Sequence, residues 1–323
     1  MIEWPASTIA HSTIIERSRT IAYDFSRQAL YAPQRRPVFV AADRVDAFQP
    51  HKRGLSLANA WWLSNAAHLA YFDGSQIEGV LHENRRSLGL SLVEFFDNGG
   101  TRGYLAGGDG FAILAFRGTQ PGEVRDLATD LKFHQRELSA VGGSVAVHSG
   151  FLEALEHVWE PVQSCLEALS ETSTPVWFTG HSLGAALATL AAVRHQPAAL
   201  YTFGSPRVGQ EGLRNVLVGF EVERFVNCTD IVTSVPPPLL RYRHAGTQRF
   251  FTHLGHLHND PDTCLVARAR RAGTFAYQKT FPLVHRGMVK LRRLADHAIV
   301  NYTESILRAM EATDGRAGNE LAV

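Results

Sequence analysis

The sequence predicts an α/β fold with a mostly parallel central sheet and helices on both faces of that sheet. Short runs of apolar residues alternate with longer runs that have helical spacing, which is typical of strand–helix–strand units. The run FAILAF at 111–116 is continuously apolar, as expected of a strand that is covered on both faces. With 323 residues, of which 45% are hydrophobic and 20% charged, the chain is long enough to bury a full core.

The first 90 residues are expected to form a mainly helical cover. Aromatic and aliphatic residues recur near helical spacing in ANAWWLSNAAHLAYF (58–72), and Asp73-Gly74 ends that helix. The N-terminus lacks the basic start and continuous apolar core of a signal peptide, and the apolar run at 183–193 is too short to span a bilayer. We therefore expect a soluble, cytoplasmic protein.

Strands and helices alternate after the cover. The runs LSLVEFFD, YLAG and FAILAF are separated by glycine-containing turns that suit hairpins. The leucines at 149–171 have helical spacing, with Ser149 as the expected cap and Pro161 as a kink or restart. The further predicted elements are a strand at 175–180, a helix at 182–196, a strand at 199–209 ending in a loop, and a strand at 220–237 that runs into a proline-rich loop.

We expect these elements to form one domain over residues 1–323. Its parts are the helical cover at 1–90, a core at 90–302, and a C-terminal helix and tail at 303–323. The formal net charge is +1, so no global field indicates a nucleic-acid partner. The three cysteines lack C-x-x-C spacing, so neither a disulfide framework nor a structural zinc site is expected at Cys165, Cys228 or Cys264.

The stretch GHSLG at 180–184 places Ser182 between two glycines, after an apolar strand and before a helix. Such a turn strains the backbone and lifts the serine hydroxyl above the carboxyl edge of the sheet, and the flanking glycines remove side chains that would clash. The start of the helix also directs backbone N–H groups toward developing negative charge. The alternative is a glycine-bounded helix start that Ser182 merely caps.

A nucleophilic serine needs a base, and the base needs an orienting acid. Asp230 follows the strand-like run RFVN, at a strand end where sites of α/β sheets are built, although it also suits an Asx turn before the prolines. His297 lies farther along the chain and is the candidate base, with a surface helix histidine as the alternative. The competing histidines are His244, His253, His256, His258 and His285. The cluster HLGHLH at 253–258 lacks a carboxylate-bearing ligand pattern, so no metal is expected.

Six motifs occur together in one order along the chain. They are FRGT (116–119), VHSGF (147–151), GHSLGAALATL (180–190), YTFGSPRVG (201–209), VNCTDIV with VPP (226–237) and DHAIVNY (296–302). With these motifs the sequence resembles the fungal-lipase-like, or class 3, lipase family over about residues 90–302. The resemblance implies an α/β-hydrolase fold and a serine carboxyl-ester hydrolase that needs no metal or organic cofactor.

The resemblance also assigns residues. It implies Ser182 as nucleophile, Asp230 as orienting acid and His297 as base, with an oxyanion hole formed by Thr119 and the backbone N–H of Leu183. His148 and His253 match family positions that we interpret as structural. The family's lid would fall at 120–133, with Pro121 and Gly122 as its hinge, and its charged residues do not favour strong interfacial activation. Asp130 in that segment is interpreted as structural.

A basic stretch lies between the candidate acid and base. Residues 268–293 contain eight Lys or Arg, no acid, and the interleaved aromatics Phe275, Tyr277 and Phe281. Such a stretch can bind an anionic membrane surface, although a solvated loop and helix would explain it equally well. The sequence therefore predicts an acylglycerol lipase with possible peripheral contact to a membrane or lipid droplet. A phospholipase A1, a short-chain esterase and a catalytically silent lipid- or protein-binding module are the alternatives.

Overall fold

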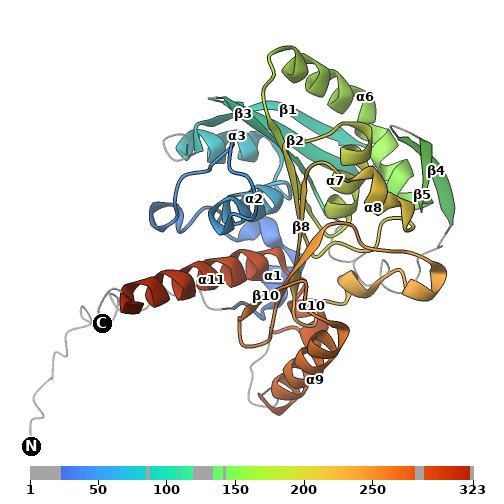
Figure 1. Cartoon of the computed structure of the whole chain (residues 1–323). Coiled ribbons are helices and arrows are strands. Elements are labelled where there is room, and N and C mark those ends of the chain that lie inside the picture. The colour runs from blue at the N-terminus through green and yellow to red at the C-terminus, as the bar shows by residue number, and fades with distance from the viewer. Residues whose placement is uncertain are drawn as a thin grey trace, which may run out of the picture.

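The central element of the structure, a computed structural model, is an eight-stranded sheet (Figure 1). The structure describes residues 23–84, 88–108, 110–118, 134–140, 143–280 and 287–320. Strands β3, β6, β7, β8 and β9 are parallel to one another, while β1, β2 and β10 add antiparallel pairs at the two edges. The order across the sheet is β1 (Leu90–Asn98), β2 (Thr101–Gly108), β3 (Phe111–Phe116), β6 (Val176–His181), β7 (Ala199–Phe203), β8 (Glu221–Asn227), β9 (Thr247–Phe251) and β10 (Leu257–Asn259). This is the mostly parallel sheet that the sequence predicted.

Strand β3 is buried on both faces, which explains its continuously apolar sequence. Phe111, Ile113 and Ala115 belong to one hydrophobic cluster, whereas Ala112, Leu114 and Phe116 belong to the other. Because successive side chains of a strand point to opposite faces, each face of the sheet carries its own core.

The helices cover the sheet in two layers. The first layer packs in one cluster with β2, β3, β6 and β7 and contains α2 (Leu57–Leu69), α3 (Gly74–Glu83) and α11 (Ile299–Glu320). The second contains α6 (Ser149–Glu171), α7 (Leu183–Arg194) and α8 (Gly212–Val216) and packs on the opposite face. Figure 1 shows these two groups on opposite sides of the sheet. Together with the sheet they form the predicted α/β-hydrolase architecture.

Several smaller elements complete the described chain. They are α1 (Arg27–Tyr31), the 3-10 turns η1 (Pro33–Arg35), η2 (Ala42–Arg44), η3 (Val232–Ser234) and η4 (Pro238–Leu240), the separate hairpin β4 (Gln135–Ala140) and β5 (Gly143–His148), α9 (Thr263–Thr280) and α10 (Arg292–Ala295). The β4–β5 hairpin, α3 and α9 were not predicted as elements from the sequence. The single domain over residues 1–323 remains a prediction, which the shared core of α2, the sheet and α11 supports.

The N-cap expected for α6 was wrong, and the helix does not restart at Pro161. The N-cap is His148 rather than Ser149, because the His148 ring nitrogen Nδ1 accepts a hydrogen bond from the Phe151 backbone N–H at 3.4 Å. Pro161 lies inside an unbroken helix. A proline cannot donate to the carbonyl four residues earlier, but here the Asn98 side chain donates to that carbonyl, on His157, at 2.8 Å. The lost helical hydrogen bond is therefore replaced from β1.

Candidate active site

Ser182 occupies a strained turn between β6 and α7. Its φ of 58° and ψ of −126° are rare for a residue with a side chain. A Cβ on Gly180 would lie 2.2 Å from the Gly184 carbonyl oxygen, and a Cβ on Gly184 would lie 2.1 Å from the Phe116 carbonyl oxygen. Both flanking positions therefore require glycine, because the obstructing atoms belong to the backbone.

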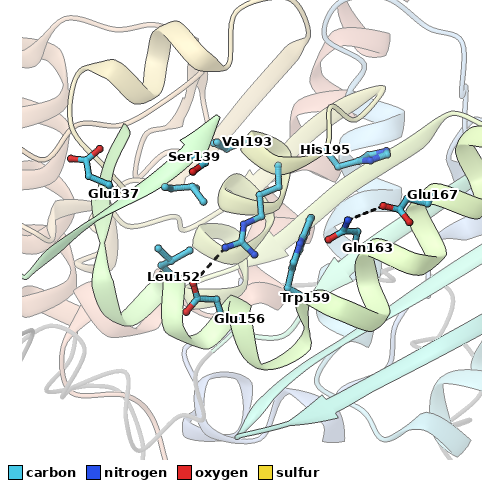
Figure 2. Close-up of a pocket in the computed structure, with 11 residues that line it drawn as sticks. Glu137, Ser139, Leu152, Glu156, Trp159, Gln163, Glu167, Val193 and His195 are labelled. Carbon is cyan, nitrogen blue, oxygen red and sulfur yellow. Dashed lines mark hydrogen bonds and ion pairs between the residues drawn. The ribbon is translucent and has the colours of Figure 1, made fainter. Parts of the chain in front are cut away.

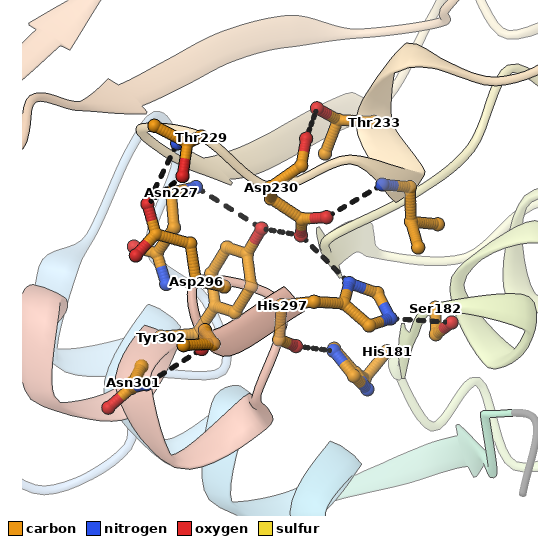
Figure 3. Close-up of polar contacts among 12 residues, drawn as sticks. His181, Ser182, Asn227, Thr229, Asp230, Thr233, Asp296, His297, Asn301 and Tyr302 are labelled. Carbon is orange, nitrogen blue, oxygen red and sulfur yellow. Dashed lines mark hydrogen bonds and ion pairs between the residues drawn. The ribbon is translucent and has the colours of Figure 1, made fainter. Parts of the chain in front are cut away.

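His297 reaches this serine from the segment between α10 and α11. Its Nε2 lies 2.9 Å from Ser182 Oγ, and its Nδ1 lies 2.9 Å from Asp230 Oδ2. Among the described competitors, His244 instead bonds the Thr233 carbonyl oxygen through Nε2. His285 lies outside the described residues. The structure thus brings Ser182, His297 and Asp230 into one hydrogen-bonded line (Figure 3).

Asp230 is held by three donors just after β8. Its Oδ2 accepts from His297 and from the Tyr302 hydroxyl at 2.6 Å, while Oδ1 accepts from the Val232 backbone N–H at 2.8 Å. Burial, followed by the charge of Asp230, raises the pKa of Tyr302 well above its usual value, so the hydroxyl remains a donor. With its oxygens occupied in this way, the Asp230 carboxylate has one orientation toward His297.

A second buried carboxylate, Asp296, fixes the loops that carry the acid and the base. Its Oδ2 accepts from both the backbone N–H and the hydroxyl of Thr229 at 2.8 Å, and its Oδ1 accepts from the Tyr23 hydroxyl at 2.8 Å. Because Thr229 precedes Asp230 and Asp296 precedes His297, these bonds tie the two loops together. This role was not predicted from the sequence, although the position of Asp296 within the motif DHAIVNY was a signal.

The residue before the nucleophile also contacts the base. The His181 ring lies 4.5 Å from the His297 ring, centroid to centroid, and its Nε2 bonds the His297 carbonyl oxygen at 2.7 Å. Burial lowers the pKa of His181 well below its usual value, so the ring is neutral. The Tyr71 hydroxyl bonds its Nδ1 at 2.7 Å, so the segment after α2 reaches the site, which was not expected from the sequence.

Gly204 lies against the acid and the base at once. Its φ is 61°, and a Cβ there would lie 2.8 Å from Asp230 Oδ2 and 3.1 Å from His297 Nδ1. Any side chain would therefore push into the Asp230–His297 hydrogen bond. This explains the glycine of the YTFGSPRVG motif in physical terms.

The predicted oxyanion residues are described in part. Leu183 is the first residue of α7, and the first N–H groups of a helix have no intrahelical acceptor. Thr119 lies outside the described residues, as does the predicted lid at 120–133 with Pro121, Gly122 and Asp130. The preceding Gly118 is described and lies against the nucleophile, since a Cβ there would be 3.0 Å from Ser182 Cβ.

The triad side chains are buried in the structure. Ser182, Asp230 and His297 are each 0% exposed. No group of three His, Cys, Asp or Glu side chains that could hold a metal ion occurs among the described residues. Within the same residues, no helix is long and apolar enough to cross a membrane.

A separate surface groove of about 610 Å³ lies between α6, the end of α7 and β4. Figure 2 shows two pairs of its polar side chains joined by dashed lines. Arg194 pairs with Glu156 at 3.5 Å and covers the Trp159 ring, while Gln163 donates to Glu167 at 2.7 Å. Among its described lining residues, Ser139 and His195 form no hydrogen bond with each other, in contrast to Ser182 and His297.

Comparison with known proteins supports the family that the sequence resembles. The family described as Lipase (class 3) matches residues 113–240. The secreted mono- and diacylglycerol lipase 1 of Fusarium solani is 38% identical over 146 residues, which is 42% of this chain and 42% of that protein. A Rhizomucor miehei lipase is 35% identical over 166 residues, 47% of this chain and 44% of that protein. These matches support a class 3 fungal-lipase-like family for the chain.

Solved structures agree with this family and fold. The Rhizomucor miehei triacylglyceride lipase superposes with a TM-score of 0.50 at 28% identity, over 59% of this chain and 78% of that chain. The Rhizomucor miehei lipase in its native propeptide complex gives a TM-score of 0.53 at 26% identity, over 67% of this chain and 76% of that chain. The chain spans less than half the length of the two curated lipases named above.

The cytoplasmic location expected from the sequence is wrong on this comparison. The matched lipase of Fusarium solani is a secreted protein, and so is the 30% identical mono- and diacylglycerol lipase A of Penicillium cyclopium. These secreted relatives contradict the cytoplasmic expectation. The composition of the N-terminal segment was therefore a poor basis for expecting a cytoplasmic protein.

Proposed function

We propose that this class 3 lipase hydrolyses carboxylic esters, with acylglycerols as substrates, through Ser182, His297 and Asp230. The observation that carries the proposal is the line of two 2.9 Å hydrogen bonds that joins the serine to the histidine and the histidine to the aspartate. A serine hydroxyl becomes a nucleophile when such a base removes its proton. The names of the Fusarium and Rhizomucor relatives support a lipase.

The first half of the reaction forms an acyl-enzyme. His297 Nε2 takes the Ser182 proton as Oγ attacks the ester carbonyl carbon, and the carbonyl π electrons move to oxygen. The tetrahedral intermediate then collapses, the bond to the alcohol oxygen breaks, and His297 returns the proton to that alcohol. Asp230 holds the His297 tautomer with Nδ1–H toward the carboxylate and stabilises the imidazolium.

The second half releases the acid. Water loses a proton to His297 as its oxygen attacks the acyl carbon, and the proton passes to Ser182 Oγ when the acyl–serine bond breaks. In both halves we propose that the Leu183 backbone N–H and Thr119 bind the oxyanion. Because Ser182 has no exposed surface, binding of an ester requires displacement of the atoms that cover it.

The second candidate is a phospholipase A1. A chloroplastic phospholipase A1 of Arabidopsis thaliana is 37% identical over 114 residues, 30% of this chain and 26% of that protein. The basic residues between Asp230 and His297 would suit an anionic headgroup. We also propose that the protein works at a membrane or lipid-droplet surface, because long-chain esters are presented there.

The test is hydrolysis of p-nitrophenyl esters of graded chain length by the full chain and by Ser182→Ala. We expect turnover by the wild type and at least a thousandfold loss in the variant. The chain-length profile separates a lipase from a short-chain esterase. Wild type without turnover on any ester would leave a silent binding module, and turnover that survives in Ser182→Ala would overturn the nucleophile.

A further inference from the structure

Three segments beside the triad form one packed unit. The Arg27 N–H donates to the Gly287 carbonyl oxygen at 2.7 Å, and the Val289 N–H donates to the Phe25 carbonyl oxygen at 2.8 Å. The Tyr277 hydroxyl of α9 donates to the Val289 carbonyl oxygen. Through these bonds α1, α9 and residues 287–295 are held together.

This unit is attached to the loops that carry the acid and the base. The Ile231 N–H, directly after Asp230, donates to the Arg293 carbonyl oxygen at 3.2 Å. Residues 292–295 form α10, which leads into Asp296 and His297. The unit therefore lies beside the triad, at the carboxyl ends of the parallel strands. Figure 1 shows α9 projecting from that part of the molecule.

Some cations of the basic stretch point inward and serve the fold. Arg270 donates to the Cys228 carbonyl oxygen at 3.1 Å and to the Thr233 hydroxyl at 3.0 Å. Arg292 pairs with Asp296 at 3.3 Å. Because partners within the protein occupy these two side chains, neither of them is counted among the cations that could meet an external ligand.

Three other cations of the stretch, all on α9, face outward. Arg268, Arg271 and Lys279 are exposed on α9, and their spacing with the exposed Phe275 places them along one side of the helix. Phe275 is 58% exposed, and the Lys279 ammonium lies 4.5 Å from its ring centroid. Residues 263–294 contain no Asp or Glu, and no ion pair to these three cations occurs in the described part of the chain.

A separate apolar hollow lies between α1 and residues 288–294, the segment that α9 contacts through Tyr277. It has a volume of about 530 Å³, and its lining includes Tyr31, Leu291 and Leu294 together with Arg27 and Lys290. Leu291 is 51% exposed. We call the outward side chains of α9 together with this hollow the basic face.

We propose that the basic face docks the protein on a bilayer that contains anionic phospholipid. Phosphate groups would meet Arg268, Arg271, Lys279 and Lys290, while Phe275 and Leu291 would enter the headgroup region. Because the formal net charge is only +1, the electrostatic attraction to the bilayer comes from the basic face alone. Docking through this face turns the carboxyl ends of the parallel strands, where the triad lies, toward the lipid. The binding claim stands alone, and its value for catalysis rests on the proposed ester hydrolysis.

The experiment measures how much of the Ser182→Ala protein floats together with lipid vesicles. This variant cannot degrade the lipid through the proposed triad. Vesicles of phosphatidylcholine are compared with vesicles that contain about 30% phosphatidylglycerol, at low salt. We expect at least about 100-fold stronger partitioning onto the anionic vesicles. Adding Arg268→Gln, Arg271→Gln and Lys279→Gln should weaken it by about 100-fold, and Phe275→Ala by about tenfold, with unchanged melting temperatures.

The matched control removes three other exposed cations, with Lys52→Gln, Arg53→Gln and Arg214→Gln. Lys52 and Arg53 lie beside Pro175 and Trp177, near the amino end of β6 and therefore at the end of the strands opposite the triad. This control changes the net charge equally and should keep its binding. Equal partitioning onto both vesicle types, equal loss in the control, or binding only to neutral triacylglycerol droplets would overturn the proposal.

Turnover of a soluble p-nitrophenyl ester by the same charge variants without Ser182→Ala separates the two proposals. We expect the α9 triple variant to retain wild-type turnover on this ester and to lose it on anionic vesicles. If the wild type hydrolyses no ester but floats with anionic vesicles, the proposed function fails and the docking stands.

Discussion

The turn that carries Ser182 is shaped by backbone contacts within and beside five residues, whereas side chains from distant segments hold the loops that carry Asp230 and His297. At the turn, Gly180 and Gly184 face backbone atoms at 2.2 and 2.1 Å from where a Cβ would stand. At the loops, Tyr302 holds Asp230 from 72 residues away in the chain. The turn is therefore local and rigid. The loops are held by a network of hydrogen bonds, in which several bonds share the positioning of Asp230 and His297.

This difference predicts that a single methyl group at the turn is the most damaging change. Gly184→Ala should lower the free energy of unfolding by more than about 4 kcal/mol or prevent folding, because the Phe116 carbonyl cannot move aside within β3. Gly79→Ala is the matched control, since nothing lies within 4 Å of its added Cβ inside α3. The control should gain up to about 1 kcal/mol in urea unfolding. Equal unfolding midpoints for the two variants would contradict the steric account.

In the network, the largest effect on rate is expected at the acid. Asp230→Asn should keep the fold and lower kcat by about 10⁴-fold, because an amide favours the wrong His297 tautomer. Steady-state hydrolysis of a soluble p-nitrophenyl ester, with melting temperature as the check on folding, measures it. A loss within about tenfold would mean that another group orients His297.

A bond that supports the acid should have a smaller effect. Tyr302→Phe removes one of three donors to Asp230 and leaves the Asn227 N–H without its acceptor, so we expect about a tenfold lower kcat and a loss of about 1–3 kcal/mol. Tyr104→Phe is the control, because its buried hydroxyl donates to the Ala66 carbonyl oxygen instead. It should lose similar stability at unchanged kcat, and equal kcat values for the two variants would remove Tyr302 from the positioning network.

A further prediction concerns acid stability and a buried histidine outside the triad. Burial lowers the pKa of His68 from 6.5 to about 4. Between these two pKa values the unfolded chain binds a proton at His68 that the folded protein does not bind. The corresponding part of the free energy of unfolding is fully present above pH 6.5. It is lost as the pH falls toward 4, by on the order of 3 kcal/mol. His68→Gln should flatten the pH dependence of unfolding in this range. An unchanged slope would show that His68 is not the source.

The same distinction explains what the sequence could predict. The strand, turn and helix around Ser182 are contiguous, so their pattern indicates both the local structure and the position of the serine. Asp230 and His297 were found by their order along the chain and by resemblance. The roles of Asp296, Tyr302 and Tyr71 depend on contacts across the fold, which no local pattern reveals.

Helix α9 and Pro161 show the same dependence in the fold. The basic residues of α9 were visible as a stretch of charge, but which of them point inward depends on the loop after β8. Pro161 was expected to kink or restart its helix, and only the position of Asn98 on a neighbouring strand shows how the helix continues through it. Long-range partners decide both cases.

The central claim is that Ser182 is a nucleophile activated by His297, and covalent labelling tests it most directly. An alkyl p-nitrophenyl phosphonate forms a bond between phosphorus and the serine oxygen and releases p-nitrophenolate, and mass spectrometry of the intact protein and its peptides locates and times the adduct. The account predicts one adduct, on Ser182, that forms at least a thousandfold more slowly in His297→Ala. An adduct on another residue, or equal rates in the wild type and His297→Ala, would contradict it.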